Sequence, residues 1–203
     1  MQTDLIAGFK QPVQDAQNVF RTTLQALSEP GLWQELALQD ALDGLNAASW
    51  SILQAMLDSD TCLYIAPELQ TDKMLQNVLF HCACVVVNDV AEADFLVVTA
   101  AMAQNMDWRQ LKRGSERSPE QSATMLVQLD DNENSHEMAT IWQGSGILNH
   151  RSVSLPIDKA FCLQRASALS FPLGVDVVFT QENSLMGLPR TTQVQFEGVA
   201  ICM

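Results

Sequence analysis

The sequence predicts one α/β domain over residues 1–203, with a mixed β-sheet covered on both faces as a three-layer sandwich. Two patterns predict this class. In the first half of the chain, apolar residues at helical spacing alternate with short apolar runs typical of buried strands. In the second half, polar turns separate strand-like runs, which favours hairpins. The apolar content of 47% suits a sizeable core, and no repeat or linker divides the chain.

The first helix is predicted to start near Pro12, because proline suits the first helical turn, and to end at the run Ser28-Glu29-Pro30-Gly31. Five apolar residues recur every three or four positions and form one stripe: Val13, Ala16, Phe20, Leu24 and Leu27. Pro30 and Gly31 end the helix, since proline cannot continue it and glycine takes the left-handed cap. A short strand is expected over residues 32–38.

Capping residues and apolar runs position the elements in the middle of the chain. Asn46 is a suitable N-cap for a second helix, and Thr71 or Asp72 caps a third. A short helix is expected over residues 105–111. Buried strands are predicted over residues 62–65, 84–87 and 95–99.

The second half of the chain contains strands around one more helix. Two hairpins are predicted, which pair residues 123–129 with 138–143 and residues 175–179 with 185–188. Asp158 opens a helix over residues 159–169. Pro189 ends the second hairpin, because proline has no N–H for the ladder. The tail from Gln193 is expected to be an edge strand or to lie on a partner.

The net charge of −13, from 11 Lys and Arg against 24 Asp and Glu, limits the possible partners. It argues against non-specific binding to nucleic acid or to anionic membranes, which need basic surfaces. It suits a basic partner protein. No apolar run reaches the roughly 20 residues of a membrane span, and the N-terminus lacks the features of a signal peptide. We therefore expect a cytoplasmic protein that binds neither membrane nor nucleic acid.

Five cysteines, four of them in apolar runs, favour reduced and buried thiols in a cytoplasm. Cys82 and Cys84 would share one face of a strand beside His81, but zinc sites use wider spacing and a second pair. We therefore expect no metal site.

The motifs GxSxG and GxxxxGK[ST], which mark hydrolases with a serine nucleophile and phosphate-binding loops, are absent. Gly144-Ser145-Gly146 is expected to be a bend rather than a phosphate loop.

Arg190 is the candidate for anion binding, with the hydroxyls of Thr191 and Thr192 beside it. The favoured interpretation is an ion pair with an acid, and a phosphate or carboxylate site is the alternative. His81 is expected to be structural. Four cations form a loop expected to be solvated surface, with a ligand or partner contact as the alternative: Arg109, Lys112, Arg113 and Arg117.

Two terminal motifs and three internal ones occur in a recognisable order. They are residues 12–17 with Phe20-Arg21 and 27–31, then 57–61, Phe80-His81, 144–147, 171–176 and 188–192. This set resembles the PhnH family, the H subunit of bacterial carbon–phosphorus lyase, over nearly the whole chain. Two departures are Cys62, where a proline is expected, and the Cys-Ala-Cys run after His81.

The resemblance implies a fold similar to the large domain of pyridoxal-phosphate-dependent transferases, without that cofactor. None of the four lysines is a candidate for a Schiff base. It implies that the chain acts with the G, I and L subunits, which attach an alkylphosphonate to C1′ of the ATP ribose and release adenine. The product is an alpha-D-ribose 1-phosphonate 5-triphosphate, and a radical iron–sulfur subunit, J, later breaks the C–P bond. The expected partners are the G, I and J subunits of a core complex, with a homodimer in isolation.

Three functions are compared. The favoured one is a non-catalytic subunit of the phosphonate-activating enzyme, with no assigned catalytic residue. The first alternative is direct binding of phosphonate or nucleotide by candidate residues gathered in one pocket: Arg21, His81, Arg190 and Thr191. The second is an independent small hydrolase or transferase, which the missing motifs disfavour.

Overall fold

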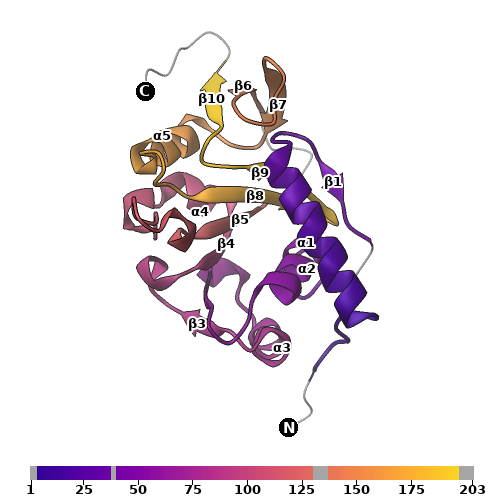
Figure 1. Cartoon of the computed structure of the whole chain (residues 1–203). Coiled ribbons are helices and arrows are strands. Elements are labelled where there is room, and N and C mark those ends of the chain that lie inside the picture. Colours follow the sequence, from indigo (N-terminus) through magenta and orange to yellow (C-terminus); the bar gives the residue numbers. More distant parts are fainter. Residues whose placement is uncertain (1–3, 38–39, 130–136, 197–203) are drawn as a thin grey trace.

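A seven-stranded mixed sheet runs through the centre of the molecule, and a three-stranded antiparallel sheet lies at one end (Figure 1). The computed structural model describes residues 4–37, 40–129 and 137–196. The helices are α1 (Pro12–Ser28), α2 (Ala47–Met56), α3 (Asp72–Cys82), α4 (Ala100–Asn105) and α5 (Lys159–Ala168). In these described ranges, no helix is both long and apolar enough to cross a membrane.

The large sheet has the order β1-β9-β8-β5-β4-β2-β3, and the small sheet has the order β10-β6-β7. Five neighbouring strands of the large sheet, from β3 to β8, are parallel, while β9 and β1 are antiparallel to their neighbours. The bounds of the large sheet are β1 Gln34–Glu35, β2 Cys62–Ile65, β3 Val85–Val87, β4 Phe95–Thr99, β5 Thr124–Gln128, β8 Asp176–Gln181 and β9 Ser184–Leu188. The small sheet has β6 Met138–Gln143, β7 Arg151–Leu155 and β10 Gln193–Phe196.

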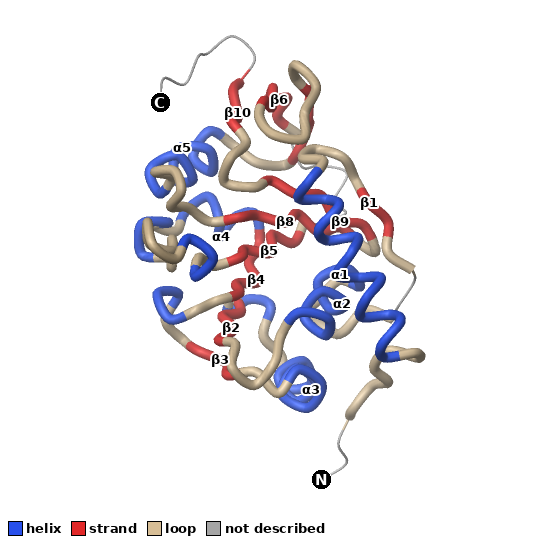
Figure 2. The backbone as a smooth tube through the Cα atoms, viewed as in Figure 1, coloured by secondary structure: helices blue, strands red, loops and turns tan. Residues whose placement is uncertain are grey.

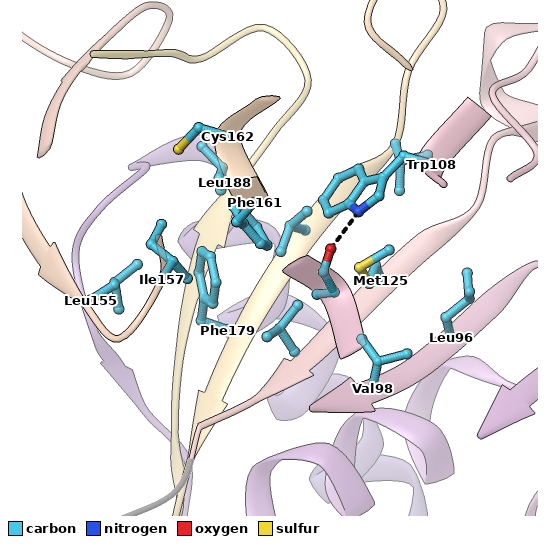
Figure 3. Packing of buried hydrophobic residues seen from close by; sticks show 14 of the residues in the cluster. Leu96, Val98, Trp108, Met125, Leu155, Ile157, Phe161, Cys162, Phe179 and Leu188 are labelled. Carbon is cyan, nitrogen blue, oxygen red and sulfur yellow. Dashed lines mark hydrogen bonds between the residues drawn. The ribbon is translucent and has the colours of Figure 1, made fainter. Parts of the chain in front are cut away.

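Both faces of the large sheet are buried, because alternate residues of its parallel strands enter two different cores. Val97, Leu126 and Val178 pack with α1, α2 and α3. Their chain neighbours pack in the second core with α4 and α5 (Figure 3). In that second core, the indole Nε1 of Trp108 donates to the carbonyl oxygen of Ala103 at 2.8 Å. The sheet therefore lies between two helical layers, as the predicted α/β class requires (Figure 2).

The local signals at the helix starts are confirmed. The side chain of Asn46 accepts from the backbone N–H of Ser49 at 2.8 Å. Thr71, rather than Asp72, caps α3 by accepting from Met74 N–H at 3.1 Å. Asp158 caps α5, and Gly31 takes the left-handed conformation with a φ of 78°. Each device needs only a few neighbouring residues.

Two predictions about pairing and position are wrong. Residues 123–129 and 138–143 do not form a hairpin: β5 lies between the parallel strands β4 and β8, whereas β6 belongs to the small sheet. The uninterrupted apolar run Met125–Val127 is the pattern of a central parallel strand. The helix expected over residues 105–111 does not form: α4 ends at Asn105, and within that range there is only a single 3₁₀ turn, Trp108–Gln110. Strand β7 was not predicted.

The apolar stripe on α1 is not the face that packs on the core. The buried residues of this helix are Val19, Thr23 and Ala26, whereas Phe20 and Leu24 are 44% and 48% exposed. Small residues face the sheet because α1 crosses β9 closely. A Cβ on Gly187 would lie 2.4 Å from the carbonyl oxygen of Ala26. The large side chains of Val13, Phe20 and Leu24 are therefore turned away from the core, whereas Leu27 at the end of the stripe packs partly against it.

This close crossing gives a first prediction. Gly187→Ala is expected to lower the free energy of unfolding by about 2 kcal/mol, because the added methyl meets rigid backbone of α1. Urea unfolding of the whole chain measures it. Ser152→Thr adds one methyl at an exposed position of β7 and is expected to change stability by less than about 0.5 kcal/mol. Equal effects of the two variants would contradict the close crossing.

Candidate functional site

The side chain of Arg190, just after β9, is the centre of the best-connected polar cluster in the described residues. Its Nε and Nη2 donate to the carboxylate of Asp176, at 3.2 and 2.5 Å. Its Nη1 donates to the carbonyl oxygens of Pro119 and Pro172, at 3.0 and 3.2 Å. Nη2 also donates to the hydroxyl of Ser122. All three guanidinium nitrogens are therefore engaged within the protein.

The backbone of Arg190 is bound to the same acid, since its N–H donates to Asp176 Oδ1 at 2.7 Å. The two side chains are only 14% and 23% exposed. The predicted ion pair of Arg190 with an acid is thus confirmed. Together, the hydrogen bonds of Arg190 join the end of β9 to β8, to the loop before β5 and to the segment between α5 and β8.

Arg190 and Thr191 line a cavity of about 800 Å³ between α5 and the segment from Ser170 to Gln195. The wall contains polar side chains together with apolar ones such as Leu169 and Phe171. Phe171 is 81% exposed. A cavity of this size, lined by both polar and apolar side chains, is large enough for a small molecule.

The cavity also contains Arg165, which the sequence reasoning missed. Arg165 lies on α5 and is only 4% exposed. Its Nη2 donates to the carbonyl oxygens of Pro189 and Thr192, at 2.8 and 2.9 Å. In the sequence, Arg165 is a single arginine in a helix whose apolar face is irregular. Such a pattern does not show whether the arginine side chain is buried or exposed.

The other two candidate residues lie on different elements. Arg21 is exposed on α1. His81 lies on α3, where its Nε2 is 3.0 Å from the carbonyl oxygen of Ile6 and its ring meets Trp50 edge-on. Neither Arg21 nor His81 is in the wall of the α5 cavity, nor in that of a smaller cavity of about 290 Å³ beside α1. The structure thus brings Arg190 and Thr191 together, and His81 attaches the N-terminal segment to α3.

The basic loop and the cysteines have partners or surroundings of their own. Lys112 pairs with Asp94 at 2.6 Å, and Arg109 pairs with Asp107 at 2.8 Å on the surface. Burial, and to a smaller extent nearby Cys84, raises the pKa of the Cys82 thiol to about 12. Cys82 ends α3 instead of sharing a strand with Cys84. In the described ranges, no group of His, Cys, Asp and Glu has the arrangement of a metal site.

The buried ion pair gives a second prediction. Arg190→Met is expected to lower the free energy of unfolding by about 3 kcal/mol, because Asp176 and two carbonyl oxygens lose their donor. Arg109→Met removes an exposed pair, with the arginine side chain 66% exposed, and is expected to cost less than about 1 kcal/mol. Urea unfolding compares them. Equal and small losses would show that the Arg190 cluster does not hold the fold.

Comparisons with known proteins agree on the family. Residues 7–195 match the family model described as bacterial phosphonate metabolism protein (PhnH). The chain is 28% identical over 201 residues to the alpha-D-ribose 1-methylphosphonate 5-triphosphate synthase subunit PhnH of Rhizobium meliloti (strain 1021), covering 97% of this chain and 98% of that protein. It is also 28% identical over 185 residues to the putative C-P lyase subunit protein HtxG of Stutzerimonas stutzeri, covering 90% and 87%. Because the family model spans nearly all the described residues, this chain belongs to the PhnH family of bacterial phosphonate metabolism proteins.

Proposed function

We propose that this chain is a non-catalytic subunit of carbon–phosphorus lyase in phosphonate catabolism. It acts with the G, I and L subunits in converting ATP and an alkylphosphonate to an alpha-D-ribose 1-phosphonate 5-triphosphate, with release of adenine. The match of residues 7–195 to the phosphonate family carries this proposal. Two relatives that are named as subunits of such systems support it. The proposed place of action is the cytoplasm.

The proposed partners are the G, I and J subunits, and the exposed stripe of α1 is the proposed contact surface. The stripe consists of Val13, Phe20 and Leu24, which are 77%, 44% and 48% exposed. Exposed apolar patches of this kind mark interfaces. Arg21, the next residue after Phe20, is exposed and adds a charge at the edge of the stripe. The net charge of −13 favours partners with basic surfaces.

A homodimer is the proposed state of the isolated chain, with its contact at the β3 edge of the large sheet. β3 is the last strand in the sheet order. Val85 on this strand is 52% exposed, and Leu79 and Phe80 on α3 are 52% and 65% exposed. An apolar edge strand is an exposed template for pairing, and a two-fold contact covers it on both copies at once.

Direct binding of phosphonate or nucleotide is the second candidate function. The observation that favours it is the cavity beside α5, where Arg190 and Thr191 meet Arg165. Arg21 and His81 have other proposed roles, in partner contact and in holding the N-terminal segment. An independent enzyme is not favoured by any feature of the described residues.

Assembly is the first test of the proposed function. Co-expression of this chain with the G, I and J subunits of its organism is expected to yield one particle containing all four. Native mass spectrometry of the purified material gives the stoichiometry. If the particle forms without this chain and adenine release proceeds at the full rate in its absence, the subunit proposal is wrong.

The α1 surface gives a further prediction. Leu24→Ser is expected to weaken incorporation into the particle at least about tenfold without lowering Tm, since it removes an exposed apolar contact. Leu148→Ser makes the same change at a residue that is 89% exposed and lies outside α1. This control is expected to assemble normally. Normal assembly of the Leu24 variant would exclude the stripe as the contact.

A further inference from the structure

Arg165 is a buried cation that forms no ion pair with another described residue. Among the described residues, the ion pairs are those of Arg109, Lys112 and Arg190, and none includes Arg165. Its Nη2 has two carbonyl acceptors, but its Nε has no hydrogen-bond partner among the described groups. Burial lowers the pKa of this guanidinium to about 10, so it still carries its charge at neutral pH. A buried charge with an unused donor is costly unless another group completes it.

A second unsatisfied polar group lies in the same place. The hydroxyl of Thr192 has no hydrogen-bond partner among the described residues, although Thr192 is only 1% exposed. These two atoms, Arg165 Nε and Thr192 Oγ1, are the only buried side-chain nitrogen or oxygen atoms without a partner in the described ranges. The carbonyl oxygen of Thr192 accepts from Arg165, which brings the two residues into contact. Two unpartnered polar atoms on residues that touch through other atoms motivate the search for a common acceptor.

Both residues line the cavity of about 800 Å³ between α5 and residues 170–195. Its wall combines hydroxyl and amide groups with apolar side chains. It has room for a small anion together with an apolar substituent or a larger group.

Arg190 lines this cavity as well, but it differs from Arg165 in its partners. Arg190 is neutralised by Asp176, and its three nitrogens have internal acceptors. The charge in the cavity wall that lacks an ion pair among the described residues therefore belongs to Arg165, on which Asp176 acts electrostatically by raising its pKa against the larger effect of burial. Cys162, one turn before Arg165 on α5, also lines the cavity, and burial raises its thiol pKa to about 11, which disfavours the thiolate at neutral pH.

We propose that this cavity binds a tetrahedral oxyanion of the phosphonate or phosphate class. Arg165 and Thr192 line the wall, but Arg165 Nε and Thr192 Oγ1 each have less than 1 Å² of accessible surface. Binding therefore includes a shift of these two side chains that lets Arg165 Nε–H and the Thr192 hydroxyl donate to the oxygens of the anion. A guanidinium and a hydroxyl are the donors that phosphoryl oxygens take in proteins. The apolar part of the wall, at Leu169 and Phe171, receives the substituent on phosphorus. The site assigns Arg165, which the sequence reasoning did not single out, and Thr192, which it placed beside Arg190 as a flanking hydroxyl. It deepens the proposed function and rests on it for the choice of a phosphonate as a probe.

Thermal unfolding of the isolated full-length chain tests the site. Methylphosphonate, inorganic phosphate and ATP are titrated at constant ionic strength, with sodium chloride as the reference salt. Methylphosphonate is expected to raise Tm by about 5 °C or more at a hundredfold excess over Kd. A rise with ATP alone would assign the site to the phosphates of a nucleotide. A rise with all three anions would assign it to the oxyanion group itself.

Thr192→Val is the decisive variant, because its fold should not depend on an unpartnered hydroxyl. In sodium chloride its Tm is expected to equal that of the native chain or to exceed it. Its affinity for the effective anion is expected to fall about tenfold, since a hydrogen bond to a charged group is lost. Arg165→Gln is expected to weaken binding at least as much. Thr23→Val, a buried change on α1, and Arg21→Gln, an exposed one, are controls expected to bind normally.

The proposal is overturned if none of the three anions raises Tm above the chloride reference. It is equally overturned if Thr192→Val and Arg165→Gln bind as tightly as the native chain. Assembly with the G, I and J subunits is measured separately. If the chain assembles but binds no oxyanion, the proposed site is wrong and the proposed function stands. If the chain binds an oxyanion but never assembles, only the proposed function is wrong.

Discussion

The ion pair of Arg190 with Asp176 is the interaction on which the end of the molecule near α5 depends. Asp176 begins β8, and Arg190 comes two residues after β9, so the pair joins the start of one strand to the exit of its hairpin mate. The remaining donors of Arg190 reach Pro119, Pro172 and Ser122 in two other segments. A single guanidinium thereby adds to the ladder of β8 and β9 a link to the loop before β5 and to the segment between α5 and β8. Arg190 also lies in the wall of the α5 cavity.

The uneven use of the cations follows from the composition. With 24 acids for 11 Lys and Arg, an internal acid partner is easy to find. Arg190, Lys112 and Arg109 each have one. Arg165 is buried more deeply than these three and has only carbonyl oxygens as acceptors. In so acidic a chain, a buried arginine without a carboxylate contrasts with its surroundings, and this contrast supports an external anion as its partner.

The sequence predicted the features that depend on neighbouring residues, such as helix caps and a hairpin. It did not predict strand pairing that depends on segments far apart in the chain. The residues that form the caps at Asn46 and Asp158 lie within four positions of each other, and the whole hairpin of β8 and β9 lies within fifteen. The position of β5 depends on β4 and β8, which are far away in the chain, so its pairing with β6 was a wrong guess about a neighbour. At the site, Arg190 was found because it lies among turn residues, whereas Arg165 has the spacing of an ordinary helical cation.

Helix α1 shows why an apolar stripe does not by itself identify a core face. The same spacing of Val13, Phe20 and Leu24 suits burial in the core or burial against a second chain. What decides between them is the surface that α1 crosses: Gly187 on β9 leaves no room for a side chain larger than those of Ala26 and Thr23. The small residues therefore face the sheet, and the large side chains of Val13, Phe20 and Leu24 stay exposed, which is the basis for proposing this face as a partner contact. Under that proposal α1 has two apolar faces, one packed on the sheet and one available to another chain.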